Sequence, residues 1–472
     1  MLSALLLVPS LITGLPAPEN LRVDLLDAPG FGQPYVTVTK TSTPSFSFLA
    51  AGNMYSANAS MTAYHIKVYT TAAGAGGEIA WDSGRVKAAA AVNIQYAGAR
   101  LSGGVQYTWE AMYAAGGTNL SPPAFGHFVC GAELPWKQAK WVGGGQRQFA
   151  VYYPQHHSIT NAVLHIASPG GAAVSIGDPR APAPKEATYP SWIGDEVGIS
   201  MWTSAADSMQ FISYNVSGSP TFVITIGGGF YVSSRGKDKG GEAVVKFMLV
   251  DSADGSVLLH SGEMGGAGQI FGRAGPVTRD DPWQGTVTDT TVANAANWVG
   301  PQGATPGRAL SALNTTTFFP LPLPYSRTRQ NISPISVEAV ASRPGAFLYK
   351  FPANIVGHAS LLASSAQGFG NITLEFCEVY NKSLEGAHGT GCLPYVNAAI
   401  EPGSIVPCAG KHGCDTYTLG SAGAETPTYF APKFTWHGFQ YVTVVPSEGV
   451  QFTGHKDALV AHWTTADVKV SS

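Results

Sequence analysis

Apolar and polar residues alternate in short runs along most of the chain, with a period of two rather than 3.6. Examples are "PSFSFLA", "AYHIKVYTT" and "VQYTWEAMYAA", all in the first quarter of the sequence. A period of two places successive side chains on opposite faces of a β-strand. The 56 Gly and 32 Pro interrupt the chain too often for long helices and supply turns between strands. The sequence therefore predicts an all-β fold.

The length of the chain sets the number of domains. At roughly 100 to 200 residues per domain, 472 residues predict about three compact units. We place three consecutive β-sandwiches at residues 18–135, 146–300 and 325–472. The segment "LPWKQAKWVGGG" reads as the connection between the first two, with Trp136 and Trp141 as anchors. In the first sandwich, we expect core positions for Trp81, Tyr107, Trp109 and Tyr113.

The N-terminus predicts export. Residues 1–17 contain the apolar stretch "MLSALLLVPSLITG" followed by small or turn-forming residues, which is typical of a signal peptide. The alternative is a buried first strand. No later run reaches the roughly 18 to 20 apolar residues that span a bilayer. Asn-x-Ser/Thr sequons, which are acceptors for N-glycosylation in secreted proteins, occur at Asn58, Asn119, Asn215, Asn314, Asn331, Asn371 and Asn381.

The cysteines agree with an extracellular location. Cys377, Cys392, Cys408 and Cys414 lie close together in the sequence, enough for two local disulfides in an oxidising compartment, and Cys130 is left over. Pairing 377 with 392 and 408 with 414 would close two small loops, although other connectivities stay open. The spacing contains no Cys-x-x-Cys knuckle, which argues against zinc.

Charge and motifs narrow the partners. The formal net charge of -3 offers no broad positive field, so we expect no nucleic acid partner. "GGGF" at residues 227–230 lacks the spacing of a dinucleotide-binding loop. "DSADG" at residues 251–255 reads as a hairpin turn, because Asp-Gly supplies the positive φ angles of tight hairpins.

Catalytic constellations are sparse. Asp280 with Asp281, and Glu375 with Glu378, are the remaining candidate pairs for glycoside hydrolysis, which needs two suitably spaced carboxyl groups. Neither pair has a favourable arrangement on a loop or strand, and no G-x-S-x-G elbow is present. His437 in "FTWHGF" could contact a sugar or hold two strands together, and we favour the structural role.

Carbohydrate binding is the functional interpretation that the sequence still supports after these candidates are weighed. Sugars present apolar faces that stack on aromatic rings and hydroxyls that need carboxylate or amide partners. In the second sandwich the candidates for such contacts, with core packing as the alternative for the aromatics, are Trp202, Tyr231, Asp280, Asp281 and Trp283.

Motifs in all three regions resemble a known family. "AWDSGRV" and "YAGARLSGGVQYTWEAMY" in the first region, "WTSAADSMQFISYNVSGSPTFVITIGGGFY" in the second and "PKFTWHGFQYVTV" in the third are similar to the β-domains that precede the catalytic barrel of bacterial-type α-L-rhamnosidases. The resemblance implies a fibronectin-III-like sandwich, a jelly roll and a terminal concanavalin-like sandwich, in that order. It also implies rhamnose-containing glycans as partners, with calcium as an accompanying ion in some related modules.

Several family positions differ in this chain. Where the family reads F-D-F-G-Q-N, "YKFPAN" places Lys350 at the acidic position and retains Asn354. Thr286 replaces a family Glu, and Gly177 with Asp178 stands where an Asn-Gly turn is usual. No segment resembles the (α/α)6 barrel that carries the catalytic acids.

Three functions remain open on the sequence. We expect a secreted, non-catalytic glycoprotein that binds carbohydrate or has a structural role outside the cell. The first alternative is an accessory part of an active rhamnosidase, and the second is a subunit that self-assembles into an extracellular coat or filament.

Overall fold

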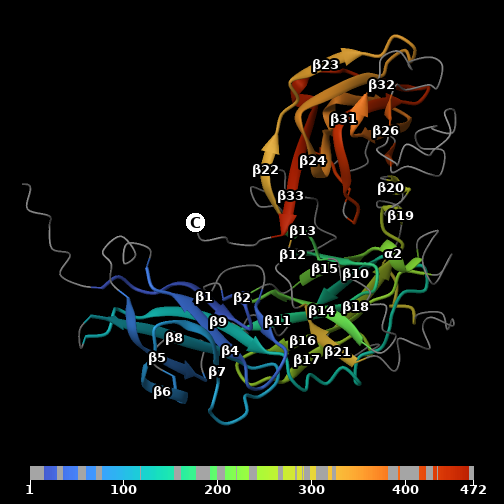
Figure 1. Ribbon diagram of the computed structural model, residues 1–472. Helices are drawn as coiled ribbons and strands as arrows, with labels where there is room; N and C mark the ends of the chain where they lie inside the picture. Colours follow the sequence, from blue (N-terminus) through green and yellow to red (C-terminus); the bar gives the residue numbers. More distant parts are fainter. Residues whose placement is uncertain are drawn as a thin grey trace, which may run out of the picture. The chain divides into compact units, whose positions relative to one another are not determined.

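The protein is seen in a computed structural model whose elements are almost all β-strands, which confirms the all-β prediction (Figure 1). The structure describes residues 15–28, 36–51, 60–70, 77–116, 119–153, 161–176, 192–198, 208–218, 221–232, 242–263, 269–281, 284–289, 291, 298–303, 317–321, 326–380, 392–393, 414–420, 429–432 and 434–466. The segment expected to be a signal peptide lies almost entirely outside these residues. No helix among them is long and apolar enough to cross a bilayer.

The chain divides into two compact units, the first formed by residues 1–134 together with 251–256. Its strands are β1 (Glu19–Val23), β2 (Leu26–Asp27), β3 (Val38–Thr39), β4 (Ser45–Leu49), β5 (Met61–Tyr69), β6 (Ile79–Lys87), β7 (Ala91–Gln95), β8 (Gln106–Ala115) and β9 (Ala124–Cys130). They form two sheets, ordered β2-β1-β4-β7 and β3-β9-β8-β5-β6.

Aromatic side chains fill the space between these two sheets. Trp109 and Tyr113 are fully buried, and the Trp109 ring lies 4.7 Å from that of Phe46. Tyr107 is also buried, and Trp81 is half-buried against the same cluster. The alternation of strand β8 therefore identified the core of this sandwich correctly. Cys130 is a buried free thiol whose pKa is raised, chiefly because burial disfavours the thiolate.

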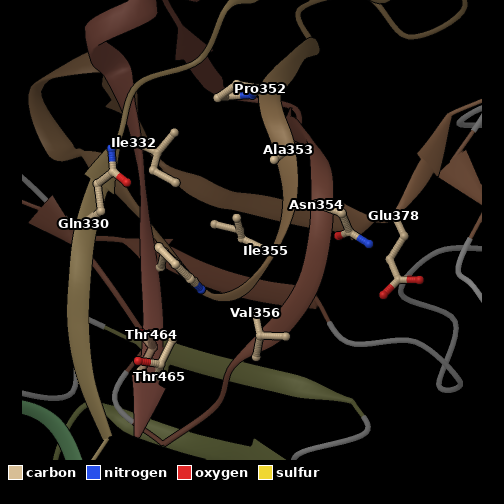
Figure 2. A pocket seen from close by; sticks show the side chains of 11 residues that line it. Gln330, Ile332, Pro352, Ala353, Asn354, Ile355, Val356, Glu378, Thr464 and Thr465 are labelled. Carbon is tan, nitrogen blue, oxygen red and sulfur yellow. The ribbon is translucent and has the colours of Figure 1, made fainter. Parts of the chain in front are cut away.

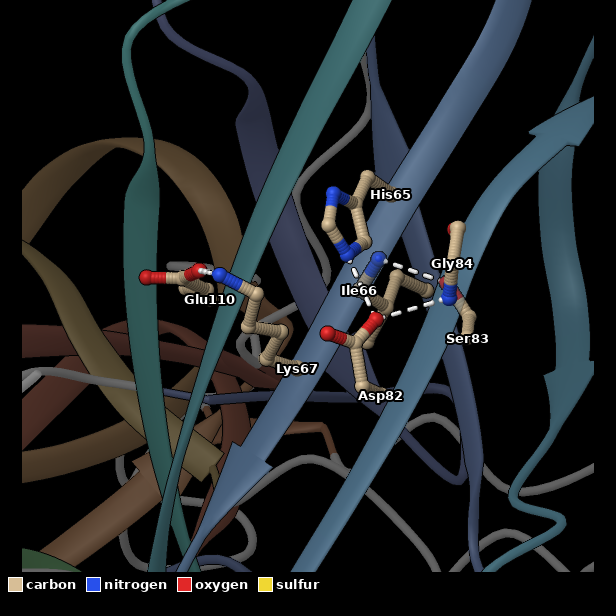
Figure 3. Close-up of polar contacts among 7 residues, drawn as sticks. All are labelled: His65, Ile66, Lys67, Asp82, Ser83, Gly84 and Glu110. Carbon is tan, nitrogen blue, oxygen red and sulfur yellow. Dashed lines mark hydrogen bonds and ion pairs between the residues drawn. The ribbon is translucent and has the colours of Figure 1, made fainter. Parts of the chain in front are cut away.

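Polar side chains on the outer face of this unit hold its edge strand in place (Figure 3). Strand β6 makes a bulge against β5 at Gly84, which has a φ of 62°. Asp82 fastens the bulge, since its carboxylate lies 2.6 Å from His65 Nε2 and accepts the Gly84 N–H at 2.7 Å. Nearby, Lys67 Nζ lies 3.2 Å from Glu110. Asp82 therefore holds the edge strand β6 to β5, and the Lys67–Glu110 ion pair joins β5 to the interior strand β8.

The second unit, residues 135–250 and 257–472, begins with two facing five-stranded sheets. Their strands are β10 (Gln148–Tyr152), β11 (Ala162–Ala167), β12 (Ala172–Ile176), β13 (Trp192–Gly198), β14 (Ser208–Asn215), β15 (Thr221–Ile226), β16 (Lys246–Asp251), β17 (Val257–His260), β18 (Gln269–Arg273) and β21 (Thr317–Pro320), with a short helix α2 (Gly229–Val232). The sheet orders are β13-β12-β15-β10-β18 and β17-β16-β11-β14-β21.

Two sequence predictions can be followed in this part of the chain. The connection after the first sandwich is anchored by its tryptophans, because Trp136 and Trp141 are both buried and Trp136 stacks on Phe318 at 4.6 Å. Strands β16 and β17 form the predicted hairpin, and Gly255 in its turn has a φ of 80°. Both features can be predicted from local sequence. Tryptophan is a residue that tends to be buried, and glycine is the residue that most readily adopts a positive φ in a hairpin turn.

The C-terminal part of the second unit is a larger sandwich. Its strands are β19 (Val277–Asp281), β20 (Gly285–Asp289), β22 (Ser326–Ile332), β23 (Ser336–Ala339), β24 (Phe347–Leu362), β25 (Ala366–Gly368), β26 (Gly370–Cys377), β27 (Val379–Tyr380), β28 (Cys392–Leu393), β29 (Cys414–Leu419), β30 (Tyr429–Phe430), β31 (His437–Pro446), β32 (Val450–Phe452) and β33 (Leu459–Ala466). The main sheet runs β19-β20-β29-β26-β31-β24-β33-β22, with β23 and β30 attached to β24.

The β19–β20 hairpin joins this C-terminal sheet by pairing β20 in parallel with β29. The motif "RDDPWQGTVTD", which spans this hairpin, falls within the range 146–300 predicted for the second sandwich, but the hairpin pairs with the C-terminal sheet. Thr286, which stands at a family Glu position, is fully buried, donates its N–H to Asp415 at 2.9 Å and shares a 2.6 Å hydroxyl contact with Thr435. A threonine at this position therefore joins the hairpin to the sheet.

Candidate functional site

The long strand β24 contains a bulge that shapes the surface beside it. Strand β24 pairs with β31 as far as Lys350 and resumes at Ile355, so the four residues 351–354 stand opposite the single residue Gln440. Gln440 donates its side-chain amide to the Phe351 carbonyl at 3.2 Å, which fixes the bulge. A proline in this segment lacks the N–H needed to continue the ladder. The bulge therefore turns residues 352–354 outward, and all three are exposed.

A cavity of about 700 Å³ lies beside this bulge (Figure 2). Its lining comes from the bulge, from β22, from β33 and from the residue that follows β26. The lining residues are Gln330, Ile332, Pro352, Ala353, Asn354, Ile355, Val356, Glu378, Trp463, Thr464 and Thr465. This volume lies in the range of pockets that take a small organic ligand.

One wall of the cavity is apolar. Ile332, Ile355 and Val356 contribute aliphatic surface, and Trp463 is 40% exposed. In the ladder, Trp463 stands directly opposite Gly357 on one side and Gln330 on the other. Gly357 must be a glycine, because a Cβ there would lie 1.8 Å from the His462 carbonyl oxygen. An exposed indole beside aliphatic side chains offers the flat apolar surface on which a sugar ring can stack.

The polar lining has unused hydrogen-bonding capacity. The side chains of Gln330, Asn354 and Glu378 have no hydrogen-bond or ion-pair partner among the described residues. Figure 2 shows Asn354 and Glu378 on one side of the cavity and Gln330 on the other. Glu378 is half-buried beside Gly438, where a Cβ would lie 2.7 Å from Glu378 Oε1. Amide and carboxylate groups left unpaired around one cavity are suited to accept and donate hydrogen bonds to a ligand.

Two of the carbohydrate-binding residues expected from the sequence, Asp280 and Asp281, are not among the residues that line the cavity. Asp280 is 2% exposed, with an ion pair to Arg147 and a hydrogen bond from the Gly229 N–H at 3.0 Å. Asp281 is also buried and accepts the Gln284 N–H at 3.2 Å. Both lie on strand β19 rather than in a loop. The Asp280 carboxylate is therefore engaged in holding β19 against α2 and against Arg147, the residue before β10.

The other expected residues are placed as follows. His437 is buried on β31, where its Nε2 lies 3.1 Å from Asp415 and its ring stacks on Phe376 at 4.0 Å. This arrangement joins β31 to β29 and β26. Trp202 and Trp283 lie outside the described residues, as do Gly177 and Asp178, and Tyr231 is in α2 with a side chain that the structure does not describe.

The acidic pair Glu375 and Glu378 is split between two roles. Glu375 is 3% exposed and lies 2.7 Å from Arg343 Nη1, whereas Glu378 lines the cavity. Lys350, at the altered family position, points toward the Tyr441 ring with 5.9 Å from Nζ to the centroid. The retained Asn354 belongs to the cavity. The described residues contain no group of three His, Cys, Asp or Glu placed to hold a metal ion, and calcium stays a prediction.

The sequons and cysteines are only partly within the described residues. Asn119, Asn331 and Asn371 are exposed, and Asn215 is half-buried with its side-chain oxygen 3.0 Å from the Ser217 N–H. Asn58, Asn314 and Asn381 lie outside the described residues. Cys377 and Cys414 are buried on the neighbouring strands β26 and β29. Cys408 is outside the described residues, and Cys392 is in β28 with a side chain that is not described.

Comparison with known proteins identifies relatives of these domains. Residues 33–126 match the family model described as the Rha78A-like, N-terminal immunoglobulin domain. No curated protein sequence matches the chain. The first sandwich is therefore immunoglobulin-like in the terms of that family, where the sequence motifs indicated a fibronectin-III-like module.

Solved structures extend the similarity over the chain. The α-L-rhamnosidase from Dictyoglumus thermophilum is 19% identical with a TM-score of 0.68, and the match covers 97% of this chain and 49% of that one. The α-L-rhamnosidase from Aspergillus terreus is 16% identical with a TM-score of 0.64, covering 96% and 49%. The Streptomyces avermitilis enzyme, complexed with L-rhamnose, is 16% identical with a TM-score of 0.59, covering 96% and 57%.

These matches confirm the resemblance to the β-domains of α-L-rhamnosidases. The family model covers most of the first sandwich, and the fold of nearly the whole chain recurs in the solved enzymes. The chain spans about half the length of those enzymes.

Proposed function

We propose that this chain is a secreted, non-catalytic glycoprotein that binds carbohydrate in the cavity beside the β24 bulge. One observation carries the proposal. Three polar side chains without partners among the described residues, Gln330, Asn354 and Glu378, surround a cavity whose apolar wall includes the exposed Trp463. An aromatic surface with a few convergent polar groups is the usual composition of a site for a small polar ligand.

The polar groups of this cavity match the chemistry of a sugar. Each hydroxyl of a sugar donates one hydrogen bond and accepts others, so amides can serve it in both directions and a carboxylate can accept from it. Elsewhere in the same sandwich, buried carboxylates are already bonded, as at Glu375 with Arg343 and Asp415 with His437. Glu378 differs from them in facing a cavity without such a partner. This contrast supports a ligand-binding role for Glu378.

The arrangement of carboxylates supports a role without catalysis. Glycoside hydrolysis by the usual routes needs two carboxyl groups facing one bond, roughly 5 to 9.5 Å apart. Glu378 is the one carboxylate among the residues that line the cavity, and Glu375 is engaged with Arg343. A bound sugar would therefore meet a single acidic group here.

A second candidate function is favoured by the extent of the match. Because the chain covers 49% to 57% of the rhamnosidase structures, these domains could act as the accessory part of a rhamnosidase and present glycans to its catalytic domain. The cavity would then hold a sugar of the same polymer away from the reacting bond. Self-assembly into a coat or filament stays a prediction.

A glycan array and a hydrolysis assay together test the proposed function. We expect purified chain to bind a subset of immobilised glycans, including rhamnose-bearing ones, because the cavity offers both an aromatic surface and unpaired polar groups. We expect no release of nitrophenol from p-nitrophenyl α-L-rhamnoside. Turnover by the purified chain would refute the non-catalytic role, and an array with no bound glycan would refute the carbohydrate-binding role.

If the chain is secreted, its sequons should carry glycans and its clustered cysteines should form disulfides. We expect the chain, expressed in a eukaryotic secretory host, to carry N-glycans and two disulfides among Cys377, Cys392, Cys408 and Cys414. The pairing of β27 with β28, which places Tyr380 opposite Cys392, brings the ends of the 377–392 loop close together. Mass spectrometry after alkylation without reductant should find these four cysteines unlabelled. Labelling of all four in folded protein, or a mass without glycans, would contradict the proposal.

A further inference from the structure

The charge of the cavity lining restricts the kind of carbohydrate that can enter. Among the lining residues, Glu378 alone is charged, and the polar remainder consists of amides and threonines. A carboxylate accepts hydrogen bonds but cannot donate them. A ligand must therefore bring a donor, such as a hydroxyl group, to Glu378.

The backbone around Glu378 leaves room for its carboxylate at the cavity wall. Strand β31 has a glycine at position 438, directly opposite Val356 of β24. Any side chain at 438 would lie against Glu378, since its Cβ would be 2.7 Å from Oε1. Because Val356 lines the cavity and is 52% exposed, this glycine lies on the strand next to the cavity wall. The strand pairing thus brings Glu378 close to residues 354–356.

Two cationic side chains near the cavity, those of Arg329 and Lys350, lie outside its lining. Arg329 precedes Gln330 on β22, and its Nε donates to the hydroxyl of Thr465 at 3.1 Å. Lys350 belongs to the neighbouring part of β24, but its ammonium lies over the Tyr441 ring. Neither cation is among the residues that line the cavity. An anionic ligand would therefore meet Glu378 without a lining cation to offset the repulsion.

We propose that the cavity selects uncharged sugars and rejects acidic ones. This inference rests on the proposed carbohydrate-binding function. In the bound state, a hydroxyl of the sugar donates to Glu378 and a second hydroxyl pairs with the amide of Asn354. The apolar face of the ring lies against Trp463. A uronate, sialate or sulfate group would bring a negative charge toward the negative charge of Glu378. The two charges would repel, and the hydrogen bond from a sugar hydroxyl to Glu378 would be lost.

Calorimetry on the full chain can test this selectivity with matched sugars. The probes are p-nitrophenyl β-D-glucoside and p-nitrophenyl α-L-rhamnoside as uncharged ligands and p-nitrophenyl β-D-glucuronide as the acidic one. We expect the better uncharged probe to bind at least about tenfold tighter than the glucuronide, which corresponds to about 1.4 kcal/mol. Because the discrimination is electrostatic, raising the salt concentration should narrow it.

The variant Glu378→Gln separates charge from shape. It keeps the size of the side chain and its accepting oxygen, so we expect the gap between uncharged and acidic probes to fall to within about threefold, mainly through tighter glucuronide binding. Glu448→Gln, at an exposed position in the same sandwich, is the matched control and should leave the gap unchanged.

The outcomes distinguish the two proposals. Wild-type chain that binds the glucuronide as tightly as the uncharged probes would overturn the selectivity while leaving carbohydrate binding intact. A gap that persists in Glu378→Gln would also overturn it, because the cause would then be shape. Wild-type chain that binds none of the three probes and no arrayed glycan would overturn the binding function and this inference with it.

Discussion

Acidification from pH 6.5 to pH 4.5 is expected to lower the free energy of unfolding by several kcal/mol, because each sandwich contains a histidine that is held neutral. Burial lowers the pKa of His127 to about 4 and that of His165 to about 3. Burial also lowers the pKa of His358 to about 3, with smaller coulombic contributions from the neighbouring His462 and His437.

Local contacts explain why these rings resist protonation. His127 Nδ1 lies 3.0 Å from the Thr108 hydroxyl. His165 Nδ1 lies 2.7 Å from the Ser213 hydroxyl, and the fully buried ring packs edge-on against Phe211. Neither ring has a carboxylate as its hydrogen-bond partner in these contacts. A charged imidazole at either position would therefore lose the solvation that it has in the unfolded chain.

The direction of the effect follows from proton linkage. The folded-state pKa values lie below the unfolded value of about 6.5, so the unfolded chain binds more protons as the pH falls below 6.5. Stability is therefore fully present above pH 6.5 and is lost as the pH falls toward the folded-state values. Each histidine contributes a slope of about 1.4 kcal/mol per pH unit in this interval. The first unit contains His127, and the second contains His165 and His358.

Urea unfolding followed by circular dichroism at pH 7, 5.5 and 4.5 measures this effect. The variant His127→Gln should reduce the pH dependence of the transition that reports the first unit by about 1.4 kcal/mol per pH unit and leave the other transition unchanged. Arg85→Gln on strand β6 of the same unit is the control and should keep the wild-type slope. Stability that is constant or rises between pH 6.5 and 4.5 would contradict the lowered pKa values of these histidines.

Alternation of apolar and polar residues was sufficient to predict the sandwich fold and much of its core. The prediction succeeded where the strand is regular, as in β8. Trp109 and Tyr113 of β8 are four residues apart, which is two strand periods, so both face the core. The alternation of apolar and polar residues within one strand does not indicate which distant strand it pairs with. The parallel pairing of β20 with β29 joins residues more than a hundred positions apart and was missed for that reason.

The cavity escaped prediction for a related reason. Its polar residues come from four separate parts of the chain, and its shape depends on a bulge created by the pairing of β24 with Gln440. One local signal was available, since Pro352 interrupts an otherwise regular strand and proline inside a strand marks a bulge or an edge. Trp463 gave no such signal, because its spacing from Ala461 and Leu459 is that of a core residue.

Replacement of Trp463 by alanine is expected to have the largest effect on ligand binding. The indole is the main flat apolar surface of the cavity, and truncation of a central tryptophan in a binding site typically costs 2 kcal/mol or more, roughly a 30-fold loss of affinity. Because the side chain is 40% exposed, the fold should tolerate the change. Trp463→Phe keeps an aromatic ring and should lose only part of the affinity.

Phe369→Ala is the matched control for this experiment. Phe369 is 65% exposed in the same sandwich but does not line the cavity. Thermal unfolding of both variants shows whether any loss of binding reflects loss of structure. A stably folded Trp463→Ala protein therefore isolates the contribution of the indole to ligand binding.

Isothermal titration calorimetry of the best glycan from the array against wild type, Trp463→Ala and Phe369→Ala tests the site most directly. We expect saturable binding at one site per chain in wild type, an affinity at least about 30-fold weaker in Trp463→Ala and no change in Phe369→Ala. Equal affinity in all three folded proteins would show that the glycan binds elsewhere and would contradict the assignment of this cavity.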